Sequence, residues 1–180
     1  MPAERKLAGL TDALRLETAR DGAFVRAVAL LERYAADAAA APHPWSWIHG
    51  DFKPDNILFG DGGAAGIDAQ LRNVTSVLED VAPFLNSLEL QCALPRAWRA
   101  RARRAALGAR FLAGYTKVMG PLPLLPLAWA RLYSASALWA YDMTIARSPV
   151  KALVAYRLHR RLVERLSAEL ATTRPAAGTG

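Results

Sequence analysis

Apolar residues recur at helical spacing in most of the long segments of this chain, and this periodicity limits the fold to a mainly helical one. The clearest stripe covers residues 23–40, where Phe24, Val28 and Leu31 fall on one helix face. Pro42 and Pro44 must end that helix. The same spacing predicts further helices over residues 4–19, from about 77, from 95 to about 119, and over 127–146 and 149–170.

Short polar signals set the expected ends of these helices. Ser76 and Glu79 have the spacing of a capping box, and Pro83 must lie in the first turns of the helix or bend it. Ser148-Pro149 has the order of a cap and a first-turn residue. With 180 residues, the chain has the size of one domain. We expect that domain to cover residues 1–172 and residues 173–180 to form a disordered tail.

The centre of the chain is the exception to the helical pattern. Residues 57–59 and 64–68 flank Gly60-Asp61-Gly62-Gly63, which is a strong turn signal between two short strands. The sequence therefore predicts a mainly α fold with a small central β-hairpin.

Cysteine content and hydropathy point to a cytoplasmic protein. Cys92 is the one cysteine, so no disulfide can form within the chain, which favours a reducing compartment. The N-terminal residues are charged and do not resemble a signal peptide. The most apolar stretch, 121–141, contains three prolines and Arg131, so we expect no membrane span.

The formal net charge of +7 is unevenly distributed. Residues 1–80 hold 8 Lys/Arg against 12 Asp/Glu, whereas residues 81–180 hold 15 against 4. The densest cluster, RAWRARARR at 96–104, has arginines at helical spacing, which favours a solvated helix face. No nucleic-acid motif accompanies it. Such a basic half could bind nucleic acid, an anionic membrane or a phosphorylated ligand. Because the solvated face is favoured, we expect neither a nucleic-acid nor a membrane partner.

The stretch WSWIHGDFKPDNILFG, residues 45–60, concentrates polar side chains between apolar flanks. Asp51 and Asn56 lie in one turn, and the hairpin returns the chain so that Asp68 arrives beside them. Carboxylate and amide oxygens suit Mg²⁺ and phosphate, and Lys53 has the charge to neutralise a transferring phosphoryl group. This arrangement is typical of phosphoryl transfer.

HGDFKPDNILF, the Asp of GIDAQ twelve residues after Asn56, and EDVAPFL at 79–85 together resemble the aminoglycoside phosphotransferase family. That family includes choline and homoserine kinases and shares the protein-kinase fold. The resemblance covers about residues 20–170 and implies the C-terminal helical lobe of a kinase-like fold. It also implies ATP and Mg²⁺ as cofactors and a small hydroxyl-bearing molecule as substrate.

The resemblance implies a role for each residue of the motif. Asp51 would receive or orient the proton of the attacking hydroxyl, Lys53 would face the γ-phosphate, and His49 would support the catalytic loop. Asn56 and Asp68 would hold Mg²⁺ on the phosphates of the nucleotide.

Asp80, the Asp of EDVAPFL, would hold the loop in place by hydrogen bonds without contacting the substrate itself. We assign no role to His43 or His159, and an ordinary turn role to Asp55. The aromatic residue that usually follows the metal-binding Asp is replaced by Ala69.

Nothing before the catalytic loop resembles the N-terminal lobe of that family, with its glycine-rich turn and phosphate-gripping lysine. Three explanations stay open: a fragment of a longer enzyme, which we favour, a second polypeptide or homodimer partner that supplies the lobe, or a reduced relative without activity. We expect weak nucleotide binding and an exposed apolar surface near the hairpin, where the lobe would dock.

The leading hypothesis is an ATP- and Mg²⁺-dependent kinase acting on an alcohol group of a small molecule. The few carboxylates after residue 80 argue against a polycationic aminoglycoside and favour a neutral or anionic acceptor. The alternative is a non-catalytic kinase-like module that binds an acidic partner through its arginine-rich helices. A metal-dependent hydrolase is a weaker third reading, because His49, Asp51 and Asp68 supply few ligands.

Overall fold

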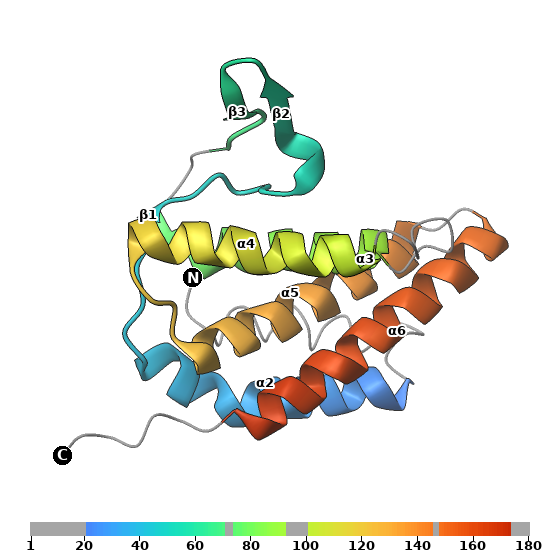
Figure 1. Ribbon diagram of the computed structural model, residues 1–180. Coiled ribbons are helices and arrows are strands. Elements are labelled where there is room, and N and C mark those ends of the chain that lie inside the picture. Colours follow the sequence, from blue (N-terminus) through green and yellow to red (C-terminus); the bar gives the residue numbers. More distant parts are fainter. Residues whose placement is uncertain (1–20, 71–73, 93–100, 146–147, 174–180) are drawn as a thin grey trace. The chain divides into compact units, whose positions relative to one another are not determined.

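A computed structural model describes residues 21–70, 74–92, 101–145 and 148–173 of the chain (Figure 1). This part contains five α-helices and two small antiparallel sheets, which confirms the mainly helical fold. It divides into two compact units, residues 1–42 with 123–180 and residues 43–122. The elements are α2 (Gly22–Ala40), β1 (Trp45–Trp47), β2 (Ile57–Gly60), β3 (Gly63–Gly66), β4 (Val74–Ser76), α3 (Leu78–Cys92), α4 (Arg101–Met119), α5 (Leu124–Ile145) and α6 (Pro149–Thr172).

Within the first unit, α2, α5 and α6 form a three-helix arrangement in which each helix packs against the other two. The periodic stripe of α2 is buried as expected, and the edge of the Phe24 ring meets Trp139 at a centroid distance of 5.5 Å. The indole N–H of Trp129 donates to the carbonyl of Leu31 at 2.9 Å. Burial of these large side chains drives the three helices together. The fully buried members of this core are Phe24, Leu31, Leu132, Trp139, Val163, Leu166 and Leu170.

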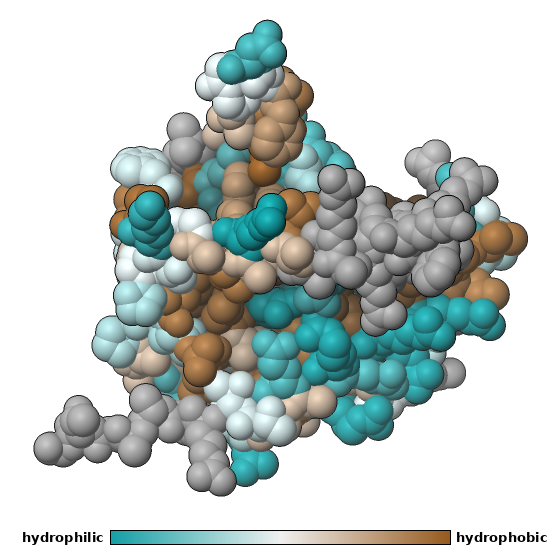
Figure 2. Space-filling model, viewed as in Figure 1, coloured by the Kyte–Doolittle hydropathy of each residue, from teal (hydrophilic) through white to brown (hydrophobic). Residues whose placement is uncertain are grey.

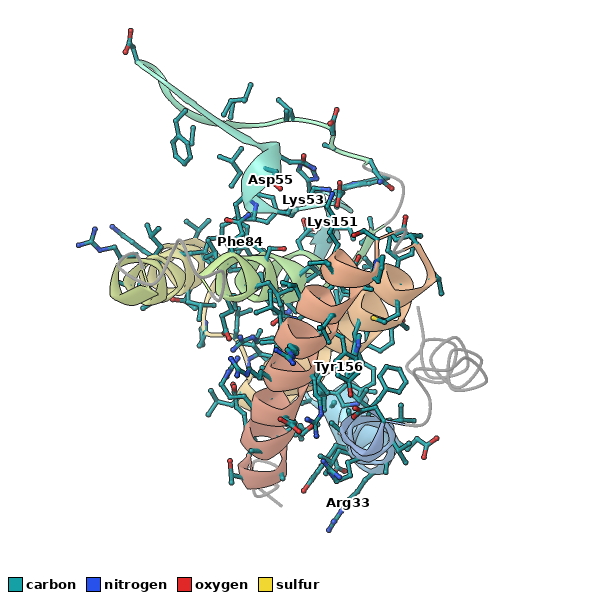
Figure 3. All side chains as sticks on the ribbon, turned by 90° about the vertical axis from the view of Figure 1, so that its right-hand side faces the viewer. Arg33, Lys53, Asp55, Phe84, Lys151 and Tyr156 are labelled. Atoms are coloured by element: carbon teal, nitrogen blue, oxygen red, sulfur yellow. The ribbon has the colours of Figure 1, made fainter. Side chains whose placement is uncertain are left out.

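Asp21 ties the start of α2 to the middle of α6. Its carboxylate caps α2 by accepting from the N–H of Ala23 at 2.7 Å. The same carboxylate accepts from the Tyr156 hydroxyl and lies 3.4 Å from the Arg160 guanidinium. Figure 3 shows Tyr156 on α6 beside α2. The Asp21 side chain therefore caps the N-terminus of α2 and also joins α2 to α6.

His159, for which no role was predicted, lies in the core of this unit. It is buried on α6, and its Nε2 is 2.7 Å from the carboxylate of Asp142 on α5. This contact satisfies one ring nitrogen at the point where the two helices meet, so His159 supports the packing of α5 on α6.

The second unit contains a two-stranded ladder that the sequence did not predict. β1 pairs antiparallel with β4, with Trp45 opposite Ser76 and Trp47 opposite Val74. Both strands are three residues long, too short for an alternating pattern to be recognised in the sequence. The ladder joins the chain just before the polar loop to the chain just before α3.

The predicted hairpin is present as β2 and β3, with Ile57 opposite Gly66 and Gly60 opposite Gly63. Gly63 has φ of +113°, a conformation that favours glycine. The second strand ends at Gly66 rather than at residue 68. Figure 2 shows hydrophobic surface on the hairpin beneath a hydrophilic turn. Phe59 is 82% exposed and Leu58 is 55% exposed, so the expected apolar surface near the hairpin exists.

α3 begins at Leu78, whose N–H donates to the Ser76 hydroxyl at 3.3 Å. The Glu79 carboxylate accepts from the Thr75 hydroxyl at 2.7 Å. Ser76 thus lies at the start of the helix as expected, but its hydroxyl binds Leu78 and the Glu79 carboxylate binds Thr75, which differs from the reciprocal bonds of a capping box. Pro83 lies inside the helix, at its sixth position.

The remaining helix ends agree with the expectations to within three residues. α4 ends at Met119 as predicted, and α5 begins at Leu124 rather than 127, with Pro126 in its first turn. α6 begins after the Ser148 cap and ends at Thr172 rather than 170. The predicted helix over 4–19, the helix start at 95 and residues 174–180 lie outside the described residues.

Among the described residues, no helix has the length and apolar content needed to cross a bilayer.

Asp21→Ala should lower the free energy of unfolding by about 1–2 kcal/mol, because it removes the cap of α2 and its link to α6. Burial raises the pKa of the Asp21 carboxyl, but the bonds from Tyr156 and Ala23 and the charge of Arg160 outweigh it and lower the pKa below 3.8. A lowered pKa gives stability that is present above the unfolded value and lost as pH falls through the folded one.

Thermal unfolding of wild type, Asp21→Ala and Asp21→Asn near pH 7 and about pH 3 tests this. Asn keeps the cap without the charge, so the gap between wild type and Asp21→Asn should narrow at the lower pH. A gap that is the same at both values would contradict the role of the carboxylate.

Candidate functional site

The polar loop, residues 49–56, connects β1 to β2 and ends in a 3-10 turn at Pro54–Asn56. Asn56 is buried, with 7% of its surface exposed. Its side-chain N–H₂ donates to the Asp51 carbonyl at 2.8 Å and to Asp51 Oδ2 at 3.0 Å. Both bonds come from the nitrogen, so the amide oxygen is directed away from Asp51.

Asp51 and Lys53 form an ion pair, with Lys53 Nζ 2.7 Å from Asp51 Oδ2. The hydrogen bond from Lys53, with a smaller contribution from Asn56, outweighs burial and lowers the pKa of the Asp51 carboxyl. The same bond raises the pKa of Lys53, and the carboxylates of Asp55 and Asp68 add to this rise. Both partners of the pair are therefore charged at neutral pH.

Figure 3 places Lys53 and Asp55 at the turn, above Phe84 of α3. The Asp55 carboxylate accepts weakly from the Gln91 side chain at the end of α3, at 3.4 Å. This contact fits the turn role that the sequence indicated for Asp55.

Asp80 of α3 holds the beginning of the loop. One carboxylate oxygen accepts from the His49 N–H at 2.6 Å and the other from the Gly50 N–H at 2.9 Å. These are the hydrogen bonds that the resemblance implied for Asp80. Gly50 has φ of +85°, and a Cβ there would meet Gln70 Cβ at 3.2 Å, so the loop start needs glycine.

Phe52, between Asp51 and Lys53, anchors the loop on the helices. Its ring stacks on Phe84 of α3 at 4.9 Å and lies 6.0 Å from Phe111 of α4. The Phe111 ring also packs against Phe84 at 4.3 Å. These aromatic contacts place the two charged neighbours of Phe52 on the opposite, solvent-facing side. Sequence reasoning missed Phe111, which lies in a helix without a strong apolar stripe.

Asp68 follows the hairpin and has φ of +59°, the one left-handed non-glycine residue in the described part of the chain. Asp tolerates this conformation better than most residues, and such strain is concentrated at functional positions. The Ile67 N–H donates to the Asn56 carbonyl at 3.0 Å, which brings Asp68 back to the loop. The Gln70 N–H donates to the His49 carbonyl at 2.7 Å, so residues 67–70 are held at both ends of the polar loop.

His49 contributes its backbone to the loop more than its ring. The ring lies 5.6 Å from Phe52 and near Gly66, and neither ring nitrogen has a hydrogen-bond partner among the described residues. The structure thus joins Asp51, Lys53 and Asn56 by hydrogen bonds between their side chains. It joins His49 to Asp80 by a hydrogen bond from the His49 backbone N–H to the Asp80 carboxylate. Asp68 joins them through the backbone and its charge.

The donor chemistry fits a hard cation such as Mg²⁺. The Asn56 amide oxygen and the Asp68 carboxylate are two oxygen donors, and Mg²⁺ commonly takes one or two protein ligands while phosphates and waters complete its shell. Within the described ranges, no group of three or more His, Cys, Asp or Glu side chains is arranged to hold a metal by itself.

The side chains of Cys92 and of the arginine cluster at 96–104 lie outside the described residues. The alternative of a non-catalytic module that binds an acidic partner through these arginines therefore stays a prediction.

Comparison with known proteins gives one family. A family model described as the phosphotransferase enzyme family matches residues 2–125, more than half of the chain. The match contains the polar loop, the hairpin, Asp68 and α3. No curated protein matches the chain.

Asp80→Ala should release the His49 and Gly50 N–H groups and cost about 1 kcal/mol or more, because two backbone donors lose a charged acceptor. Amide hydrogen exchange at these residues should accelerate, while exchange in α6 should not change. Asp61→Ala, at the exposed hairpin turn, is the matched control. Equal protection of His49 and Gly50 in both variants would refute the holding role of Asp80.

Proposed function

We propose that this chain, which belongs to the phosphotransferase enzyme family, is the catalytic helical lobe of an ATP- and Mg²⁺-dependent kinase. Its acceptor would be the hydroxyl of a small molecule. Residues 1–172 would form the C-terminal lobe of a kinase-like fold, and the other wall of the nucleotide cleft would come from an N-terminal lobe.

The orientation of Asn56 is the observation that carries this proposal. Its amide nitrogen is committed to Asp51 by two hydrogen bonds, so its oxygen is left for a cation. A residue that only connected the turn to the start of β2 would not need to be buried with its amide nitrogen fixed in this way. Asp68, whose charge reaches Lys53, would be the second ligand.

Asp51 is ionised and has one carboxylate oxygen available to accept a hydrogen bond from an acceptor hydroxyl. Lys53 and Asn56 both bind Oδ2, and Oδ1 has no hydrogen-bond partner among the described residues. Oδ1 can therefore accept the hydrogen of the attacking hydroxyl and orient its oxygen. Since the pKa of Asp51 is lowered, this acceptor is lost only in acid, as pH falls through that lowered value.

Lys53 and the metal would divide the charge of the transferring group. Bound Mg²⁺ would neutralise phosphate oxygens and fix the geometry of the nucleotide. Lys53 has a raised pKa and stays protonated, so it can move from Asp51 Oδ2 toward phosphate when that stronger anion arrives. His49 and Asp80 would act only by holding the loop.

The acceptor class follows from charge. The region after residue 80, which would supply much of the acceptor site, holds 15 Lys/Arg against 4 Asp/Glu. Such a surface favours a neutral or anionic alcohol over a polycationic aminoglycoside. Phosphorylation of kanamycin by a form of the enzyme that contains both lobes would overturn this choice.

Asp68→Ala should abolish binding of Mg·ATP, because one of two protein oxygens for the metal is removed. Isothermal titration calorimetry of wild type, Asp68→Ala and the control Asp61→Ala measures this, with binding by wild type and Asp61→Ala expected to be weak but detectable. A parallel titration of ATP without Mg²⁺ separates the metal-dependent part of ATP binding from the rest. Equal binding by all three proteins would remove Asp68 from the metal role.

Phe59→Ser should reduce the binding of a hydrophobic dye, because Phe59 is the most exposed large apolar residue of the hairpin. Leu58→Ser should add to the effect, while the thermal unfolding temperature of both variants stays close to that of wild type. Equal dye fluorescence with wild type and with the Leu58→Ser, Phe59→Ser double variant would argue against an apolar docking surface for an N-terminal lobe on the hairpin.

A further inference from the structure

The tip where α5 meets α6 exposes aliphatic side chains to solvent. On α6, Val150 is 71% exposed and Leu153 is 51% exposed, with Val154 beside them at 44%. Ile145, the last residue of α5, is 52% exposed. Figure 2 shows this hydrophobic surface at the start of α6, followed by hydrophilic surface along the same helix. Core packing does not explain four exposed aliphatic residues at one tip.

The hydrophilic surface that follows is basic. Lys151, Arg157, Arg160 and Arg161 are exposed, and residues 149–163 contain no acidic side chain. Arg160 pairs with Asp21 and Glu164, whereas Arg157 and Arg161 form no ion pair with any described residue. Lys151 lies in the first turn, where the helix macrodipole disfavours a cation. Arg160 therefore contributes to the packing of α6, whereas the charges of Lys151, Arg157 and Arg161 have no such role among the described residues.

We propose that this tip, Ile145 with Val150–Val154, and the basic face behind it form a docking surface for an anionic phospholipid bilayer. The aliphatic side chains would enter the boundary between headgroups and acyl chains. Arg157 would meet the lipid phosphates, and the long side chains of Lys151 and Arg161 would reach toward that level from either side of it.

The spacing along α6 agrees with this geometry. Seven residues separate Val150 from Arg157, which is about 10 Å of helix rise. An interfacial element is buried by roughly 5–10 Å, so Arg157 reaches the phosphate level when Val150 is inserted. Exposed aliphatic side chains need no complementary groove to be buried in lipid, whereas a protein partner would have to provide one. Charge complementarity then favours an anionic lipid surface.

We thereby revise the expectation of no membrane partner, which was drawn from reading the basic half of the sequence as a solvated helix face and from the lack of a spanning segment. Contact with a surface requires no span. The proposal also concerns residues beyond the family match, which ends at residue 125, and it does not depend on the proposed kinase activity.

Co-sedimentation of the purified chain with vesicles tests it. We expect binding to an equal mixture of phosphatidylcholine and phosphatidylglycerol, little binding to phosphatidylcholine alone, and loss of binding when the salt is raised from about 0.1 M to 1 M. Binding to both vesicle types that salt does not change, or binding to neither, would overturn the proposal.

Substitutions in the basic and in the aliphatic part of the surface separate their contributions to binding. Arg157→Glu and Arg161→Glu should each weaken binding to the mixed vesicles by at least about fivefold, since each charge near the surface contributes about 1 kcal/mol. Val150→Ser with Val154→Ser should also weaken binding, without a change in its salt dependence.

The matched control is Arg33→Glu on α2, which makes the same charge change. Figure 3 shows Arg33 and Lys151 at opposite ends of this helical unit. All these side chains are exposed, and circular dichroism checks that each variant is folded. If Arg33→Glu weakens binding as much as Arg157→Glu does, net charge alone is responsible and the proposed surface is wrong.

Discussion

The carboxylate of Asp80 accepts from the backbone N–H groups of His49 and Gly50, and the geometry of the polar loop depends on these two bonds. Backbone donors at the start of a loop must find an acceptor, and a charged acceptor on a packed helix is stronger than water. Because Asp80 lies in the first turn of α3, the helix core determines where the loop begins. Helix α3 therefore sets the direction in which the loop starts, although the loop has little secondary structure of its own.

From that fixed start, each polar side chain is oriented by a different kind of contact. Phe52 is held by aromatic packing, so its neighbours Asp51 and Lys53 face outward. Asn56 is held by two hydrogen bonds, and Asp68 by a left-handed backbone that the hairpin returns to the loop. No single strong bond creates the cluster. Its charges are paired, since Lys53 Nζ lies 2.7 Å from Asp51 Oδ2 and both side chains are partly exposed to solvent.

Periodicity and turn residues in the sequence were sufficient to predict α2, the hairpin and the end of α4. Each depends on local signals, such as the stripe through Phe24 and Leu31 or the glycines around Asp61. The β1–β4 ladder was not predictable, because its pairing joins residues about thirty positions apart in strands of three residues. Likewise, motif spacing indicated Asp51, Asn56 and Asp80, while the supports from Phe111 and Gln70 come from tertiary contacts that no local pattern records.

The family match includes α2 but ends at the start of α5, and the packing of α2 shows what the remaining helices contribute. Phe24 is covered by Trp139 and the Leu31 carbonyl is bonded by Trp129, both on α5 beyond residue 125. Asp21 takes two partners from α6. The inner faces of α5 and α6 are therefore constrained by α2, and truncation at residue 125 would expose its apolar stripe. Their outward faces are free of that constraint, and it is on the outward face of α6 that aliphatic and basic residues gather without a structural need for them.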